Sequence, residues 1–341
     1  MSEELLAPHD GDHDVDLVFL WVDGAVPGWQ ERRRADFDRW SLDNPEELAL
    51  FGNSSGRYRD NGELRYNLRA VERFLTHVRH IFIVTDQQRP SWLTPSDRLT
   101  IVDHSEIVTE ATGSIYDSGN IESYLHHIGG LAERFIYLND DVFFGAPLDV
   151  RTWFEPTMTV YMESGATVLS ERPQPGLPVP VNAAALTNEW MSTNYSGYEH
   201  VNGTFSHSPR PMRKSVMFEI ESEASALFSS VRSTAFRSWR FPSLLTDFVP
   251  RWMVHHGYAR LEVFDSVYVS TGSPEAAEEL AQVAATFGSL PFFCLNDTCD
   301  EADVDDERLV RVRETLEHIL PLPSSFERRE VGSTFSVSGE D

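Results

Sequence analysis

Two adjacent carboxylates, Asp140 and Asp141, follow the apolar run 135–138 in this chain of 341 residues. A run of that length is typical of a buried strand, so both acids would stand in the turn at its end and could approach one ligand. Such oxygen donors suit Mg²⁺ or Mn²⁺, which would complete its shell with diphosphate oxygens and water. The simpler interpretation is a pair of solvated acids, because aspartate is common in turns.

Arginine and histidine side chains could serve the same chemistry. Arg65 and Arg69 are one helical turn apart, and guanidinium groups bind phosphate oxygens in a bidentate manner. His207 precedes a helical pattern and could take a proton from a hydroxyl group. Each has a structural alternative, because such arginines usually form a solvated helix face. A single histidine, like Arg240 and Asp247, more often has a structural role.

These side chains need a scaffold that brings them together, and the first 150 residues predict one. Runs of strand length occur at 15–22, 80–85, 98–103 and 135–138, and helical patterns separate several of them. This alternation predicts an α/β fold with a mostly parallel sheet and helices on both faces. Ligands of such sheets bind at the carboxyl ends of the strands. Asp23, Asp86 and the triplet 139–141 would stand there.

The predicted secondary structure changes after about residue 150. Helical patterns then dominate, at 182–193, 211–229, 244–256, 274–287 and 304–320, and strands are expected to return at 265–270 and 290–295. We therefore expect a flexible N-terminus at 1–14, an α/β core at 15–150, a mainly helical region at 151–320 that completes the core, and a disordered tail at 321–341.

The charge balance limits the partners of the chain. It has 28 Lys and Arg against 54 Asp and Glu, a formal charge of −26, which opposes the binding of nucleic acid. An anionic ligand must therefore be held locally, by clustered arginines or a divalent cation. No apolar run approaches the roughly 20 residues that span a bilayer, and 1–14 does not resemble a signal peptide. We expect a cytoplasmic protein, at most peripheral at the inner face of the membrane, with Cys294 and Cys299 as reduced thiols.

Several motifs taken together are more specific than any of these residues alone. The chain reads DLVFLWVDG at 16–24, NGELRYNLR at 61–69, IESYLH at 121–126, FIYLNDDVFFG at 135–145 and FCLND at 293–297. These motifs closely resemble signatures of the Stealth family, and 207–221 looks like the third region of that family. The family includes bacterial capsular polysaccharide phosphotransferases and the catalytic subunit of the lysosomal-enzyme N-acetylglucosamine-1-phosphotransferase. The resemblance covers roughly residues 14–320.

The resemblance implies a GT-A-like nucleotide-sugar-transferase core and the transfer of hexose 1-phosphate from a UDP-sugar. UDP-N-acetylglucosamine is the favoured donor and a glycan hydroxyl the acceptor. Attack on the β-phosphate would form a phosphodiester and release UMP, in capsule or other exopolysaccharide synthesis.

Within that framework we assign provisional roles. Mg²⁺ or Mn²⁺ would be held by Asp140, Asp141 and Asp297, and Arg240 would contact phosphate together with the arginines at 65 and 69. His207 would be the base, and Asp23, Asp141 and Arg240 would share in catalysis. The residues expected to bind the donor are Trp21, Asp23, Gly24, Glu63, Arg65, Arg69, Asp86, Glu122, His126 and Asn139.

Two other functions are compatible with the same sequence. A metal-dependent glycosyltransferase would use the same donor site, transfer the sugar alone and release UDP. A non-catalytic scaffold that binds nucleotide sugars is disfavoured by the presence of the acid pair, the arginine pair and His207.

Overall fold

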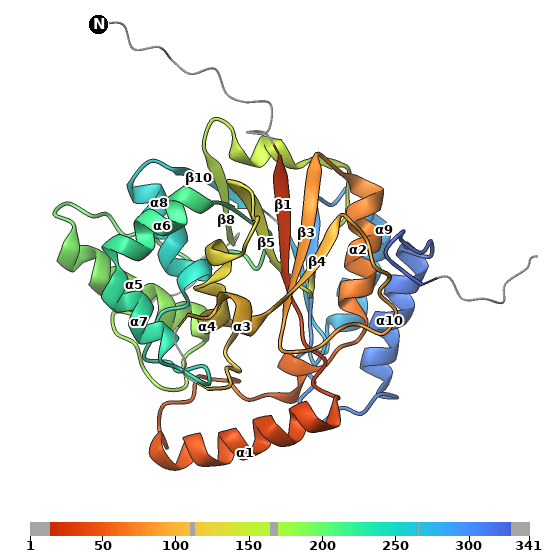
Figure 1. The fold of residues 1–341 in the computed structure, drawn as a ribbon, viewed down its shortest axis with the longest axis horizontal. Helices are drawn as coiled ribbons and strands as arrows, with labels where there is room; N and C mark the ends of the chain where they lie inside the picture. Colours follow the sequence, from red (N-terminus) through yellow and green to blue (C-terminus); the bar gives the residue numbers. More distant parts are fainter. Residues whose placement is uncertain (1–13, 110–112, 164–169, 265, 329–341) are drawn as a thin grey trace, which may run out of the picture.

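A five-stranded sheet with the order β4-β3-β1-β5-β9 lies at the centre of the molecule (Figure 1). β1 (Val15–Leu20) pairs in parallel with β3 (Val78–Thr85) and with β5 (Arg134–Asn139). β3 pairs in parallel with β4 (Leu99–Asp103), and β9 (Arg210–Arg213) is antiparallel to β5. The predicted α/β fold with a mostly parallel sheet is confirmed. This computed structural model describes residues 14–109, 113–163, 170–264 and 266–328.

The central strand β1 is apolar because it has neighbours on both sides. Its residues 15–19 are fully buried, as is typical of a strand inside a parallel sheet. The one polar side chain among them, Asp16, accepts hydrogen bonds from Arg79 Nε at 2.9 Å and from the Ala132 amide at 2.7 Å. The buried charge is therefore compensated at the amino end of the strand.

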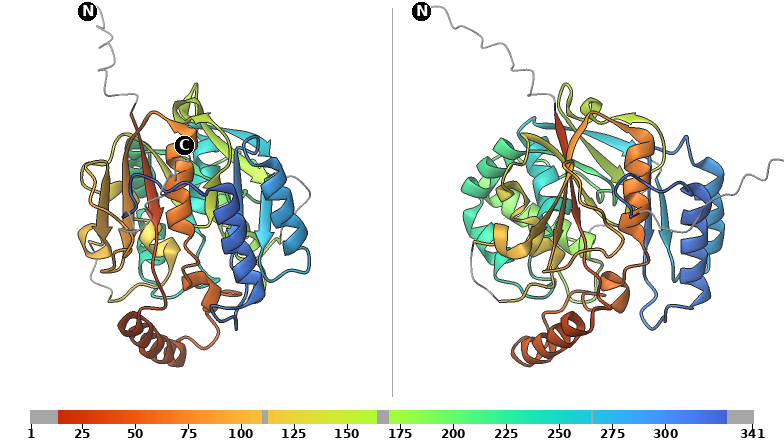
Figure 2. Two further views of the ribbon diagram at one scale, coloured as in Figure 1. Left: turned by 90° about the vertical axis from the view of Figure 1, so that its right-hand side faces the viewer. Right: turned by 45° about the vertical axis from the view of Figure 1, so that its right-hand side comes forward.

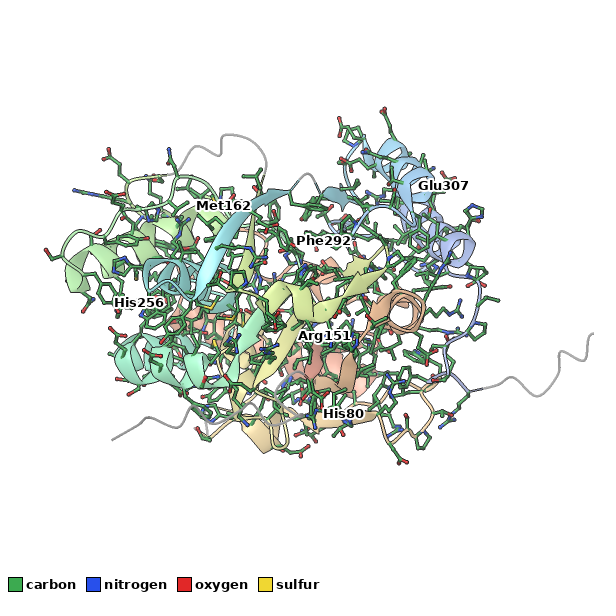
Figure 3. The ribbon with its side chains drawn as sticks, turned by 90° about the horizontal axis from the view of Figure 1, so that it is seen from above. His80, Arg151, Met162, His256, Phe292 and Glu307 are labelled. Carbon is green, nitrogen blue, oxygen red and sulfur yellow. The ribbon has the colours of Figure 1, made fainter. Side chains whose placement is uncertain are left out.

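The helices form groups on either side of this sheet (Figures 1 and 2). α2, α9 and α10 stand together on one side and α5 to α8 on the other, while α1 lies across one end. Seen from above, Glu307 at the start of α10 and His256 just after α8 lie at opposite sides of the molecule (Figure 3). The longer helices are α1 (Pro27–Asp43), α2 (Glu63–Phe74), α5 (Val179–Asn194), α6 (Lys214–Glu223), α7 (Ser225–Arg232), α8 (Val249–His255), α9 (Ala276–Thr286) and α10 (Glu307–Ile319).

Shorter elements connect these parts. The short helices are α3 (His104–Ile107), α4 (Ser118–Glu122), the 3-10 turns η2 (Ser55–Tyr58), η3 (Leu125–His127) and η4 (Val150–Phe154), and the π-helical turn η5 (Leu244–Phe248). The remaining strands are β2 (Leu75–Thr76), β6 (Val142–Phe144), β7 (Leu148–Asp149), β8 (Met158–Glu163), β10 (Ala259–Phe264), β11 (Val267–Ser270) and β12 (Phe292–Asn296).

The second half of the chain contains more strand than the sequence patterns predicted. β8 and β10 form a parallel pair that was not predicted. β11 and β12 lie where strands were predicted, at 265–270 and 290–295, and form a three-stranded sheet with β6. The segment 211–229, predicted as one helix, begins instead as β9 and continues as two helices. Pro211 fits there because β9 is an edge strand, where a missing amide donor is tolerated.

The predicted disordered tail at 321–341 is wrong for its first residues. Phe326 is buried, and the buried Glu327 carboxylate accepts hydrogen bonds from Arg69 Nε at 2.8 Å and Nη2 at 2.9 Å, and from Arg65 Nε. Polar composition favoured disorder, but these ion pairs fasten 321–328 to α2. Residues 329–341 and the N-terminal 1–13 lie outside the described residues.

One continuous apolar core joins the two halves, since it includes residues from Val15 to Phe326. The predicted division at about residue 150 stays a prediction. Among the described residues, no helix combines the length and the apolar character that crossing a bilayer requires.

Replacing Glu327 with alanine should lower the free energy of unfolding by ~3–5 kcal/mol, because it removes the buried charge partner of Arg69 and leaves only an exposed one. The matched control is Glu317→Ala. That carboxylate contacts the same arginine at 3.2 Å but is 56% exposed, so its loss should cost at most about 1 kcal/mol. Urea unfolding at pH 7 measures both values. Equal losses would contradict the anchoring role of Glu327.

The same carboxylate should make stability depend on pH. Burial would raise the pKa of Glu327, but the hydrogen bonds from Arg69, Ser324 and Arg65 outweigh it and lower the pKa from 4.5 to about 2. A carboxyl group with a lowered folded-state pKa stabilises the fold above its unfolded pKa, and that contribution is lost as the pH falls toward the folded value. The stability difference between the wild type and Glu327→Ala should therefore shrink from about pH 5 to pH 3. A constant difference would argue against this linkage.

Candidate active site

A cavity of about 470 Å³ lies at the carboxyl ends of the central strands, as predicted from the fold class. Trp21 after β1, His104 after β4 and Asn139, Asp140 and Asp141 at the end of β5 line it. This volume falls in the range of about 300–1,000 Å³ that is usual for ligand sites.

Carboxylates crowd one wall of the cavity. Glu63, in the first turn of α2, is buried close to Asp140 and Asp60, although Asn61 donates to it from its backbone amide at 2.6 Å and from Nδ2 at 2.9 Å. Burial and the nearby Asp60 raise the pKa of Glu63 to about 8. Burial, Glu63 and Asp141 raise the pKa of Asp140 well above its usual range. The crowding of these groups therefore disfavours their charged forms, and a bound cation would favour them.

His207 and Asp141 meet in this cavity although 66 residues separate them. His207 Nε2 lies 3.1 Å from Asp141 Oδ1, and the Cys294 thiol donates to Asp141 Oδ2 at 3.6 Å. The backbone of Asp141 is fixed as well, because its carbonyl accepts the Leu295 amide at 2.9 Å where β12 pairs with β6. The cavity thus contains a histidine whose ring is oriented by a held carboxylate.

Arginines that the sequence analysis did not single out face the same cavity. Arg210 is buried, and its guanidinium donates to the Ser206 carbonyl at 3.2 Å. The buried Nε of Arg57 has no acceptor. Within the described part of the chain, neither of these two guanidiniums forms an ion pair, whereas Arg237 pairs with Asp117 at 3.1 Å. Unpaired guanidiniums in a cavity are suited to an anionic ligand.

Glu122 and Asn139 also line the cavity, in agreement with their predicted location. Both accept from the hydroxyl of Tyr137, at 2.9 Å and 3.1 Å. The second carboxylate oxygen of Glu122 is buried and has no donor. It can accept a hydrogen bond from a hydroxyl or N–H group of a ligand.

An aromatic cluster forms part of another wall and was not predicted. The ring of Trp29 lies 5.5 Å from the rings of both Tyr58 and Tyr116. Asp86, expected to bind the donor, does not line the cavity. It accepts from Trp29 Nε1 and from Arg32, each at 2.8 Å, so it holds the indole in place.

The phosphate-binding role predicted for the arginine pair is not supported by its position. Arg65 and Arg69 do not line the cavity, because their guanidiniums bind Glu327. Arg69 also donates to the Leu320 carbonyl at 2.6 Å. The helical spacing of the pair was correct, but its partner is a carboxylate of this chain.

The roles predicted for Arg240 in catalysis and for His126 in donor binding do not fit their positions either. Arg240 lies outside the cavity and pairs with Glu47 at 3.1 Å. His126 is buried within η3, where its Nε2 lies 2.5 Å from Glu221. Burial lowers the pKa of His126, and Arg232 holds the other oxygen of the same carboxylate. His126 therefore supports the fold, and Arg240 forms a partly exposed ion pair away from the cavity.

Two residues of the first motif have backbone roles outside the cavity. Asp23 Oδ1 accepts from the Ala25 amide at 2.8 Å and so closes a turn. The Gly24 amide donates to the Tyr58 carbonyl at 2.7 Å, and a Cβ at Gly24 would lie only 2.4 Å from that oxygen. Glycine is needed here so that η2 can approach.

Asp297 lines the cavity as predicted, but other groups already occupy its oxygens. Oδ2 accepts from Arg59 at 2.5 Å and from Asn61 at 3.2 Å, and Oδ1 accepts from the Cys299 amide at 2.9 Å. Asp297 is therefore placed to join the loops around the cavity, and a role as metal ligand would require these bonds to break.

Comparison with known proteins gives relatives over most of the chain. Exopolysaccharide phosphotransferase SCO6023 of Streptomyces coelicolor is 35% identical over 326 residues, 95% of this chain and 54% of that protein. Exopolysaccharide phosphotransferase CpsY of Mycobacterium tuberculosis is 32% identical over 329 residues, 95% of this chain and 60% of that protein. This chain thus spans little more than half of these two relatives. Capsular polysaccharide phosphotransferase LcbA of Aeromonas hydrophila is 33% identical over 289 residues, 84% of this chain and 79% of LcbA.

Two family models match segments that build the cavity. Residues 57–162 match conserved region 2 of Stealth proteins and include both adjacent aspartates. Residues 289–332 match conserved region 4 and include Cys294 and Asp297. These matches, with the similarity over most of LcbA, show that the chain belongs to the Stealth family.

Proposed function

We propose that this protein transfers a hexose 1-phosphate from a UDP-sugar, with UDP-N-acetylglucosamine favoured, to a glycan hydroxyl in surface polysaccharide synthesis. The acceptor oxygen attacks the β-phosphorus, the bond from that phosphorus to the bridging oxygen breaks, and UMP leaves. The observation that carries the proposal is one cavity lined both by crowded carboxyl groups and by guanidiniums without ion pairs among the described residues. The names of the relatives, all phosphotransferases of exopolysaccharide or capsular polysaccharide, support it.

Arg57 and Arg210 take the phosphate-binding role in this proposal, in place of the arginines at 65, 69 and 240. Both line the cavity. Charge-assisted hydrogen bonds from guanidinium groups to phosphate oxygens strengthen as negative charge develops on the leaving nucleotide. The buried oxygen of Glu122 is available to a donor hydroxyl, and we propose a GT-A-like mode of nucleotide-sugar binding for the parallel sheet.

The carboxylate wall fits a hard divalent cation such as Mg²⁺ or Mn²⁺. Asp140 and Asp141 would hold it, since both line the cavity with Glu63 and a bound cation would favour the charged forms of these crowded carboxyl groups. When bound, such a cation neutralises charge on the diphosphate and on the departing UMP. Asp297 fits less well because Arg59 occupies its carboxylate.

His207 is the proposed base. If its Nε2–H donates to Asp141 Oδ1, the ring presents Nδ1 as the proton acceptor for the glycan hydroxyl. Asp141 would also stabilise the imidazolium that forms. The hydroxyl proton thus moves to Nδ1 while the oxygen attacks phosphorus.

The products of the nucleotide donor test the reaction. The protein incubated with UDP-N-acetylglucosamine, Mg²⁺ and a panel of oligosaccharide acceptors should release UMP, and the glycan should gain one N-acetylhexosamine phosphate in mass. Chromatography of the nucleotides and intact mass of the glycan measure both. Release of UDP with gain of sugar alone would show a glycosyltransferase instead.

Removing the proposed base should slow turnover without loss of donor binding. His207→Ala should reduce kcat by roughly a hundredfold or more, with the Kd of the donor little changed. The control is His318→Ala, on the exposed face of α10. Steady-state kinetics and calorimetry with UDP-N-acetylglucosamine give the two values. A variant at 207 that turns over like the wild type would exclude this base.

Two variants distinguish Arg210 from Arg240 as the residue that binds phosphate. Arg210→Ala should weaken donor binding by about 10- to 100-fold, because each hydrogen bond between charged groups contributes ~1.5–3 kcal/mol. Arg240→Ala, which removes an arginine outside the cavity, should leave the donor Kd within about twofold of the wild type. Isothermal titration with the donor measures both. The reverse order of effects would restore the sequence-based assignment.

A further inference from the structure

The end of the cavity next to His207 is built from residues that the proposed chemistry does not use. Tyr268, on the edge strand β11, lines the cavity with a side chain that is 42% exposed. Its ring stands at 90° to the His207 ring, with centroids 6.4 Å apart. Glu163, the last residue of β8, lines the same cavity. An exposed aromatic ring therefore adjoins the proposed base, and a carboxylate lines the cavity with them.

Both side chains are held in place by neighbours. Asn296 Nδ2 donates to the Tyr268 hydroxyl. Glu163 Oε2 accepts from Thr204 Oγ1 at 2.7 Å, and the Glu163 amide donates to the Thr204 carbonyl at 3.1 Å. The loop that carries Thr204 is fixed by the buried Arg251, which donates to the Gly203 carbonyl at 2.7 Å.

The two groups also lie close to each other. The pKa of Tyr268 is raised, chiefly by desolvation at its hydroxyl end and also by the nearby acidic groups Cys294, Asp141 and Glu163. The base, the ring and the carboxylate thus form one corner of the cavity. When the acceptor hydroxyl reaches His207, the neighbouring atoms of the acceptor occupy this corner.

The chemistry of this corner matches one face and one edge of a sugar. A hexose ring has an apolar face of C–H groups, which packs on an aromatic ring, and hydroxyl groups around its edge, which donate to a carboxylate. A charged sugar fits poorly, because Glu163 and Asp141 would repel a carboxylate or phosphate at contact distance.

We propose that Tyr268 and Glu163 form the acceptor subsite and select a glycan whose terminal sugar is an uncharged hexose. Its apolar face packs on the Tyr268 ring and one of its hydroxyls donates to Glu163, while a second hydroxyl faces His207. This inference rests on the proposed phosphotransfer and specifies the class of acceptor for it.

The test compares acceptor and donor kinetics in the full chain. UMP release is measured with UDP-N-acetylglucosamine, Mg²⁺ and two matched sets of oligosaccharides, ending in a neutral hexose or in the corresponding hexuronic acid. The wild type should prefer the neutral set. Tyr268→Ala should raise the KM for the neutral acceptor at least about tenfold and leave the KM for the donor within about twofold. Tyr268→Phe, which keeps the ring, should restore most of the acceptor affinity.

Glu163→Gln should raise the KM for the neutral acceptor several-fold and reduce the preference over the hexuronic acid set, because the repulsive charge is gone. Phe218→Ala is the matched control, since Phe218 on α6 has the same exposed fraction of 42% and does not line the cavity. Thermal unfolding confirms that each variant is folded.

The possible results distinguish failure of the proposed phosphotransfer from failure of the acceptor subsite. If the wild type releases no UMP with any acceptor, the proposed function fails and this subsite with it. If the wild type turns over but Tyr268→Ala leaves the acceptor KM unchanged, or raises the donor KM equally, the subsite is wrong and the phosphotransfer stands. A wild type that prefers hexuronic acid ends would also overturn the subsite.

Discussion

The crowding of carboxylates at the end of β5 is the constraint on which the cavity depends. Asp140 and Asp141 leave the strand together, and Glu63 and Asp60 approach from the start of α2. Burial of several carboxyl groups at close range is unfavourable, so the fold fixes each of these segments from outside the cavity. α2 is tied to the C-terminal segment through Glu327, and the turn after β5 is tied to β12 through backbone hydrogen bonds. The carboxyl cluster is thus maintained by structural bonds that do not themselves supply a compensating positive charge.

The sheet and the position of the acid pair could be predicted from sequence because both follow from local patterns. Apolar runs alternate with helical patterns, and that alternation fixes a parallel sheet whose strand ends share one edge. The predicted strand at 135–138 agrees closely with β5, so Asp140 and Asp141 were placed correctly. The second half was less predictable, because β8 pairs with β10, a segment far from it in the sequence, and no local pattern shows such a pairing.

The arginines show where local patterns fail. Helical spacing puts Arg65 and Arg69 on one face of α2, but it cannot show that a carboxylate more than 250 residues later covers that face. Conversely, Arg57 and Arg210 lie in a short turn and on an edge strand, with no spacing that marks them as a pair. What distinguishes them is the lack of an ion pair in a buried setting, a property of the tertiary structure. The structural role of His126 could not be predicted for the same reason, because its partner Glu221 is distant in sequence.

The antiparallel pairing of β6 with β12 has a consequence for how this architecture can vary. It brings Val142 opposite Cys294. The Asp141 carboxylate and the Cys294 thiol that donates to it therefore come from the two ends of a very long chain segment. The entropy of closing such a connection grows only with the logarithm of its length, so inserting an entire extra module into a surface loop between these strands would add little to that cost. Chains of very different length can therefore keep the same reaction centre, provided that the two short strands still meet.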